Sequence, residues 1–300
     1  MRMLAAPLAT ILAAVSCAGQ PANLSDWPHL IDKNDSKAAR TLCSAYLDSK
    51  DVAQRVEAQK CLANVALCGN DITVIGEEKG TVSMRPGYKS QAAVDEALIH
   101  LNIGLKLAPQ DLSIHKGRLH VLETAGRYSA MVKALDESCA IYKGKDAPDT
   151  WLAYAVELSG LREYKAALEF NKVLDRHYPN SPDVVGNVGA FLSMLDRSAE
   201  AIPYLKKAVS LAPKDAINVW NLARAYDDTN QVQLANKWFL EGLLLQTDPS
   251  QRKKSSCFYA HFIEKKLHER PRACSMEKED CSSEERTACG PVPDTPTSKK

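Results

Sequence analysis

The chain lacks an excess of charge of either sign. Its 38 basic and 37 acidic side chains leave a net charge of +1, so no sequence-wide field attracts nucleic acid or anionic lipid. Aromatic residues are scarce at 6%, and no basic patch carries interleaved aromatics. We therefore expect no nucleic-acid partner.

The common catalytic motifs are also missing. The sequence has no glycine-rich phosphate loop ending in Lys-Ser/Thr, no Gly-x-Ser-x-Gly, no His-Glu-x-x-His and no Cys-x-x-Cys. We therefore predict a protein that is not an enzyme and that carries no cofactor and no metal. An exported enzyme is the alternative; it would need a buried cluster with shifted pKa values, for example near His120 or within residues 69–90.

The only long apolar run lies at the N-terminus. Residues 4–15 are almost continuously apolar, follow the basic start Met1-Arg2-Met3, and are followed by small residues around Cys17. This layout is typical of a secretory signal peptide, here residues 1–17, and the run is too short for a stable membrane anchor. Two interpretations are open: Ala14-Val15-Ser16-Cys17 resembles a lipoprotein signal that lipidates Cys17, or simple cleavage near Ser16 or Ala18 releases a soluble exported protein. In the first case Cys17 is the chain's sole membrane attachment.

A period of 34 residues dominates the C-terminal half. It relates small residues in two columns and prolines in a third: Ala155, Gly189 and Ala223; Ala167, Ala201 and Ala235; Pro179 and Pro213. Such a period indicates helix-turn-helix units that stack to bury their apolar faces. With its small residues in each helix and its closing proline, the pattern resembles the tetratricopeptide repeat. The resemblance implies an all-α solenoid with three clear units over 148–249, a degenerate unit over 112–145 in which Met131 replaces alanine, and a half unit ending at Pro109.

The remaining segments flank this solenoid. Two β-favouring runs around Gly76–Gly80 predict a short hairpin insertion. The expected organisation is a signal peptide (1–17), a tether (18–35), an N-terminal helix pair (36–68), the insertion (69–90), the solenoid (91–249), a capping helix (250–270) and a cysteine-containing, partly disordered tail (271–300).

The cysteine count agrees with export. Of nine cysteines, eight remain once Cys17 is lipidated or removed, and an even set in an exported chain indicates a disulfide framework. The two groups are Cys43, Cys61, Cys68 and Cys139, and Cys257, Cys274, Cys281 and Cys289. Each group allows three connectivities. A zinc half-site of Cys257, His261 and His268, within a metal-binding cysteine-rich module, is a further alternative.

Candidate partner-binding residues lie on the first helix of each repeat, which in the resembled family lines a concave groove. They are Asn187, Trp220, Asn221 and Arg224, with Lys116 and His120 from the degenerate unit. Amides one period apart can hold a peptide backbone, and Trp and Arg are enriched where binding energy concentrates. The alternative is a solvated inner face with Trp220 half buried. The sequence thus predicts a non-enzymatic scaffold of the cell envelope, periplasmic, anchored to the outer membrane or secreted, that binds a protein or extended peptide. It leaves the oligomeric state open.

Overall fold

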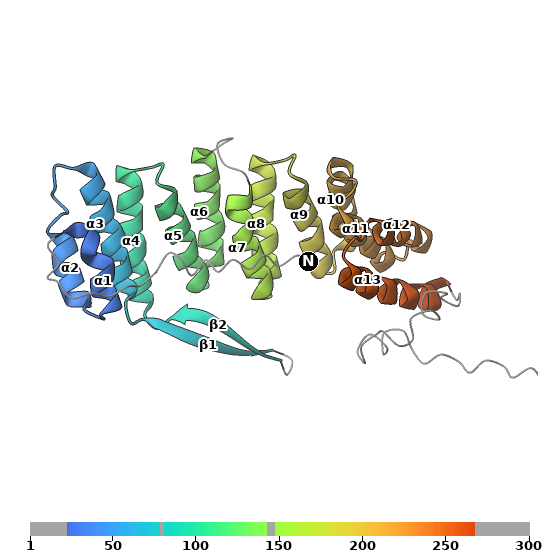
Figure 1. Cartoon of the computed structure of the whole chain (residues 1–300), viewed down its shortest axis with the longest axis horizontal. Coiled ribbons are helices and arrows are strands. Elements are labelled where there is room, and N and C mark those ends of the chain that lie inside the picture. The colour runs from blue at the N-terminus through green and yellow to red at the C-terminus, as the bar shows by residue number, and fades with distance from the viewer. Residues whose placement is uncertain (1–22, 79–80, 143–147, 268–300) are drawn as a thin grey trace, which may run out of the picture. The chain divides into compact units, whose positions relative to one another are not determined.

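The computed structural model describes residues 23–78, 81–142 and 148–267, without the side chains of residues 73–85. Cys17, the signal peptide, His268 and the tail cysteines lie outside these residues. The chain divides into two compact units, residues 1–177 and 178–300, and each is described by itself. Both are built of paired antiparallel helices, which confirms the all-α repeat fold (Figure 1).

The first unit contains eight helices and one two-stranded sheet within its described residues. They are α1 (Trp27–Asp32), α2 (Ser36–Ser44), α3 (Val52–Leu67), β1 (Asp71–Glu78), β2 (Thr81–Tyr88), α4 (Gln91–Leu107), α5 (Leu112–Thr124), α6 (Tyr128–Ile141), α7 (Asp149–Gly160) and α8 (Tyr164–His177). A short 3₁₀ turn, Leu24–Asp26, precedes α1. The second unit contains α9 (Pro182–Met194), α10 (Ser198–Leu211), α11 (Ala216–Asp228), α12 (Val232–Leu245) and α13 (Pro249–Phe262), followed by a π turn, Ile263–Leu267.

The repeat period is visible in the backbone of the turns within the helix pairs. Gly126, Arg162, Asp196 and Asn230 occupy equivalent turn positions, and all four have φ between 57° and 70°. The residue after each one donates its N–H to a carbonyl in the last turn of the first helix, as in Arg127 to Leu122 and Glu163 to Leu158. This is the hydrogen-bond pattern of a helix C-cap in which one residue is left-handed.

The small-residue columns lie where the sequence predicts close helix contacts. Ala155, Ala223 and the alanines of the second column are fully buried. At Gly189, an added Cβ would lie 2.5 Å from Cγ of Leu205 on α10. Glycine at this position therefore lets α9 and α10 approach each other more closely than any larger residue would allow.

The N-terminal region differs from the expected tether. Residues 24–32 are helical, and Leu24, Trp27 and Leu30 are buried in a core with α2 and α3. The same core contains a disulfide between Cys43 on α2 and Cys61 on α3. The tether prediction is wrong for these residues because their large apolar side chains can be buried against α2 and α3.

The pairing of the N-terminal helices also differs from the expected one. Asn34, between α1 and α2, has φ 59°, and the N–H of Asp35 donates to the Leu30 carbonyl. This is the same turn that joins the two helices within each later pair. α3 packs along α4, and the hairpin of β1 and β2 is inserted between them. The half unit expected at 91–109 is therefore a whole repeat whose first helix is α3.

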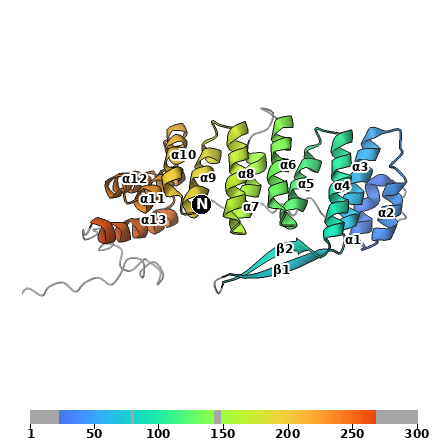
Figure 2. The ribbon, with the colours of Figure 1, turned by 180° about the vertical axis from the view of Figure 1, so that it is seen from behind.

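The hairpin is antiparallel, with Asp71 opposite Tyr88 and Glu78 opposite Thr81, and its presence confirms the predicted insertion. Figure 2 shows it leaving the ends of α3 and α4 and running past α5. β2 packs against α5, which brings Tyr88 to Thr124 at the end of that helix. The insertion thus lies beside the last turn of α5, the first helix of its repeat.

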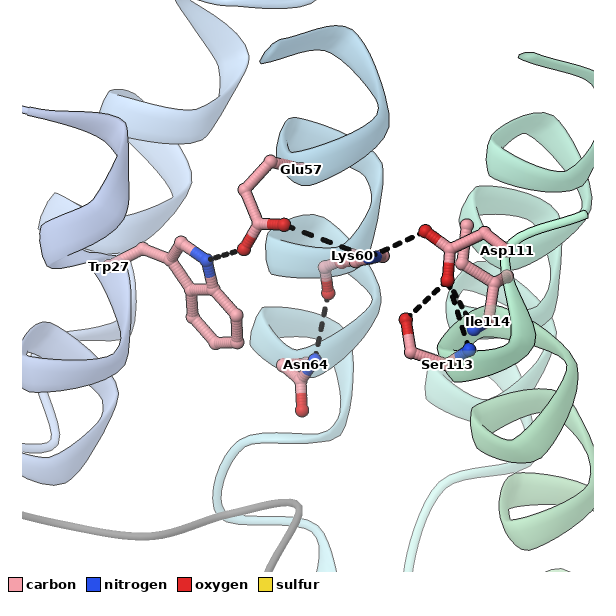
Figure 3. A network of polar contacts seen from close by, with 7 residues as sticks. All are labelled: Trp27, Glu57, Lys60, Asn64, Asp111, Ser113 and Ile114. Atoms are coloured by element: carbon pink, nitrogen blue, oxygen red, sulfur yellow. Dashed lines mark hydrogen bonds and ion pairs between the residues drawn. The ribbon is translucent and has the colours of Figure 1, made fainter. Parts of the chain in front are cut away.

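A polar network joins α3 to the start of α5 (Figure 3). The Trp27 indole donates to Glu57 at 2.8 Å, and Lys60 lies 2.7 Å from Asp111. Asp111 also caps α5 by accepting from the Ser113 N–H at 2.9 Å. Partial burial would raise the pKa of Asp111, but its bonds from Lys60 and Ser113 outweigh this effect and lower it.

Candidate functional site

Three of the predicted partner-binding residues lie on neighbouring first helices of the second unit. Asn187 is on α9, and Asn221 and Arg224 are on α11, which packs against α9. Both asparagines are half-buried and the arginine is exposed. None of the three side chains makes a hydrogen bond or ion pair with another described residue.

These helices are firmly positioned. The Ser181 hydroxyl accepts from the Val184 N–H at the start of α9, and Asp215 accepts from the Ile217 N–H at the start of α11. A nearby amide, Asn218, is buried and donates to Asp215 at 2.8 Å, so its hydrogen bonding serves the fold. Asn187, Asn221 and Arg224 instead offer unused donors and acceptors on helices with capped N-termini.

Trp220 lies differently from its three predicted neighbours. Its ring centroid is 4.8 Å from that of Phe239 on α12 and 5.7 Å from that of Phe258 on α13. Phe262 also packs on Phe239, at 5.0 Å. Trp220 therefore helps to hold α12 and α13 together, as the half-buried alternative expects, and any part in partner binding stays a prediction.

Lys116 and His120, on α5, belong to the first unit. The Lys116 backbone carbonyl accepts from the Tyr154 hydroxyl of α7 at 3.0 Å. His120 is exposed at its surface, yet the surrounding protein lowers its pKa, and the Glu157 and Asp71 carboxylates partly oppose this shift. Because the His120 ring remains in contact with solvent, its lowered pKa has little effect on the free energy of folding. The two predicted sets thus lie in separate units.

A carboxyl pair that the sequence analysis does not predict lies next to His120. Glu123, one turn further along α5, is 6% exposed and shares a hydrogen bond with the half-buried Glu157 of α7. Burial and this second carboxyl raise the pKa of Glu123 to about 9. At neutral pH Glu123 is therefore protonated and donates to Glu157.

The described surroundings of this pair are polar. One oxygen of Glu123, Oε1, is buried without a hydrogen-bond partner in the described structure. Burial, followed by the Glu123 and Glu157 charges, raises the pKa of Tyr154, so that its hydroxyl stays neutral. Tyr88 of β2 likewise has a raised pKa, mainly from burial and partly from Asp71, while Thr124 opposes the shift.

No sequence signal marks Glu123. In the repeat register it is equivalent to Ser159, Ser193 and Asp227, so a polar residue at this position is ordinary. The pair forms because α5 and α7 bring two glutamates from different repeat positions together, and a 34-residue period does not reveal such a contact.

Among the described residues, no helix has the length and apolarity needed to span a bilayer. Within the same ranges, no group of three or more His, Cys, Asp or Glu side chains could hold a metal ion. The proposed zinc half-site includes His268, which lies outside them.

Comparisons with known proteins give one family match. Residues 185–215, covering most of α9 and α10, match the family model of the tetratricopeptide repeat. This places one recognised repeat at the helix pair that carries Asn187. No curated protein matches the chain.

Several solved structures show a distant likeness. The C-terminal part of a TPR repeat-containing protein from Cytophaga hutchinsonii is 12% identical, with 82% of this chain and 88% of that chain covered and a TM-score of 0.46. YrrB, a TPR protein with an unusual peptide-binding site, is 14% identical over 70% and 95%, with a TM-score of 0.40. Pseudomonas aeruginosa PilF is 15% identical over 58% and 78%, with a TM-score of 0.38. At these scores, the description of the fold rests on the helices themselves.

Proposed function

We propose that this protein is a non-enzymatic interaction scaffold that binds a protein or extended peptide through first helices of its repeats. The observation that carries the proposal is the set Asn187, Asn221 and Arg224: polar groups without partners among the described residues, on two adjacent, well-capped helices. Two amides one repeat apart can each donate to and accept from a peptide backbone. Arg224 adds a cation at the same face, suited to an acidic group of the partner.

Crosslinking and binding measurements test this proposal together. A photo-crosslinking amino acid at Asn221 should capture a partner that the same group at Lys206, exposed on the second helix α10, does not. With the identified partner purified, Asn221→Ala and Arg224→Ala should each weaken binding by about 1 kcal/mol, roughly fivefold in Kd, with little change in thermal stability. Unchanged affinity in both variants would exclude this face as the binding surface.

We also propose that the protein is exported and acts in the cell envelope. The signal-like residues 1–17 support export, and the Cys43–Cys61 disulfide suits an oxidising compartment. Lipidation at Cys17 and simple cleavage nearby remain alternatives, and the mass of the mature N-terminus separates them. If Cys17 is lipidated, Cys17→Ser should release the protein from the membrane fraction.

The Glu123–Glu157 pair is the observation that favours an enzyme as the second candidate. A carboxylic acid that holds its proton at neutral pH can act as a general acid. Such an acid must touch its substrate, however, and Glu123 is 6% exposed, with one oxygen fully buried. The described geometry therefore supports the enzyme candidate less well than the interaction scaffold.

A further inference from the structure

The hairpin of the first unit has a sheet edge without a neighbouring strand among the described residues. β1 and β2 form a two-stranded sheet, so each strand pairs on one side only. β2 packs against α5, and Figure 2 shows β2 on the side of the helices and β1 on the outer side. A two-stranded hairpin is marginally stable by itself, and a third strand stabilises it. The edge of β1 that faces away from β2, here called the outer edge, is where such a strand can be added.

The strand register identifies the backbone groups at this outer edge. Asp71 lies opposite Tyr88, and one residue earlier in β1 the Lys89 N–H donates to the Asn70 carbonyl at 2.8 Å. In an antiparallel ladder, hydrogen-bonded pairs alternate with pairs whose N–H and C=O groups point away from the partner strand. Residues 71, 73, 75 and 77 of β1 therefore direct these groups to the outer edge, over a length of about 20 Å.

Pro86 agrees with this alternation and distinguishes the two edges of the sheet. It lies opposite Thr73, at a position where the backbone of β2 points away from β1, so its missing N–H takes no bond from the ladder. The far edge of β2 therefore lacks a donor, and it lies on the side of α5. β1 contains no proline, and its residues Ile72 to Ile75 are all β-branched and favour extended structure. An added strand thus fits β1 and not β2.

The charge of β1 favours a basic partner over a second copy of this chain. Asp71, Glu77 and Glu78 are acidic, and β1 has no basic residue. If two copies paired their β1 strands antiparallel with Val74 opposite Ile75, Asp71 would lie opposite Glu78. A parallel pair in register would place identical acids side by side. Like charges at such positions are destabilising, whereas lysine or arginine near both ends of the added strand would be complementary.

We propose that the outer edge of β1 binds an extended, basic segment of a partner protein as a third strand. The backbone groups of residues 71, 73, 75 and 77 hydrogen-bond the segment and supply the affinity, as in other cases of strand addition. A β-branched centre pairs along Ile72 to Ile75, and basic residues near the two ends lie by Asp71 and by Glu77 and Glu78. This surface goes beyond the proposed helical face, because it belongs to the first unit and recognises a backbone through strand pairing.

The test uses the mature full-length protein and the peptide acetyl-Lys-Val-Thr-Val-Thr-Val-Lys-amide as the probe. Amide hydrogen exchange, followed by NMR, reports on each residue of β1. In the free protein, exchange should be slower at Val74 and Gly76, which face β2, than at Thr73 and Ile75. The probe should slow exchange at Thr73, Ile75 and Glu77 at least tenfold and leave Val74 nearly unchanged.

Two methylated probes separate strand pairing from simple charge attraction. A probe N-methylated at alternate residues keeps one free edge and should bind like the unmethylated peptide. A probe of the same charge that is N-methylated at two adjacent central residues has no free edge and should bind at least tenfold more weakly. Equal affinity for the two methylated probes, or no binding of the unmethylated probe at about 1 mM, would overturn the proposal.

Matched proline variants locate the binding edge. Ile75→Pro removes one N–H from the outer edge of β1 and should weaken the probe at least tenfold, with slow exchange at Val74 showing that the hairpin is intact. Met84→Pro, at the residue opposite Ile75, changes the far edge of β2 and should leave binding unchanged. Unchanged affinity in Ile75→Pro would overturn the proposal. Exchange that is already slow at Thr73 and Ile75 without the probe would also overturn it, because a second copy or another part of the chain would then cover this edge. The Asn221 and Arg224 measurements decide separately on the helical face.

Discussion

At the scale of single residues, the burial of Glu123 links folding to pH. Its folded pKa is about 9, far above the ordinary value of 4.5, so between these values the folded state holds a proton that the unfolded state has lost. Stability should therefore fall as the pH rises through this window. Glu123→Gln removes the titration and should stabilise the protein by roughly 1–3 kcal/mol at pH 8, with a smaller gain at pH 5.

Urea unfolding of both proteins from pH 5 to pH 9 checks this prediction. Glu241→Gln, which replaces an exposed glutamate, serves as the control and should follow the wild type. A gain from Glu123→Gln that stays constant across the whole range would show that Glu123 titrates normally in the folded protein.

Gly189 offers a second test at the same scale. A Cβ added there would lie 2.5 Å and 2.8 Å from two Leu205 carbons and 3.3 Å from the Ala201 carbonyl oxygen. Gly189→Ala should therefore destabilise the protein by roughly 1–3 kcal/mol through overpacking. Gly160→Ala is the matched control: nothing lies within 4 Å of its Cβ, so this change should be neutral or stabilising. Thermal unfolding of the two variants measures the difference, and equal effects would exclude close helix packing at Gly189.

The two residues also show what a sequence can and cannot predict. Gly189 belongs to a column of small residues that repeats every 34 positions in three successive units, where two helices pack closely. Glu123 depends on a contact between α5 and α7 that does not repeat. Its position is also polar in the three units that follow, so only the three-dimensional arrangement distinguishes it.

At the scale of helices, Trp220 separates packing from binding. Because its ring packs on Phe239 and Phe258, Trp220→Ala should loosen α12 and α13 and cost about 3 kcal/mol or more. The adjacent Asn221→Ala should change the free energy of unfolding by about 0.5 kcal/mol or less. Chemical denaturation of the two variants compares them directly. If the Trp220→Ala protein were as stable as the wild type, Trp220 would not contribute to packing, and the sequence-based prediction that it belongs to the partner-binding face would stand.

The helix pairing was harder to predict than the helices. Residues 36–68 and 91–109 both have helical patterns, but the hairpin between them hides that α3 and α4 form one repeat. The N-terminal pair is hidden for another reason: α1 spans only six residues, too few for a period to appear. Its turn identifies it, since Asn34 has the left-handed backbone found at the equivalent turn position within each of the later pairs.

At the scale of the whole molecule, the oxidation state of the cysteines tests the proposed export. The structure joins Cys43 to Cys61, 18 residues apart, inside the N-terminal core. The sequence predicts eight mature cysteines that are largely oxidised, three of which lie outside the described residues. Protein taken from its native compartment should therefore show few free thiols when alkylated and weighed intact. Four or more free thiols per chain would contradict export into an oxidising compartment.

The same bridge allows a test that depends only on the described structure. Opening a loop of this length should cost roughly 3 kcal/mol, because the unfolded chain regains the freedom that the bridge removes. Replacing both Cys43 and Cys61 with alanine should lower stability by about that amount. Cys68→Ala is the matched control, since Cys68 is half-buried at the end of α3 and forms no disulfide, and it should have a much smaller effect. If the double variant were as stable as the control, the N-terminal core would hold α2 against α3 by packing alone, and the bridge would no longer support an oxidising compartment.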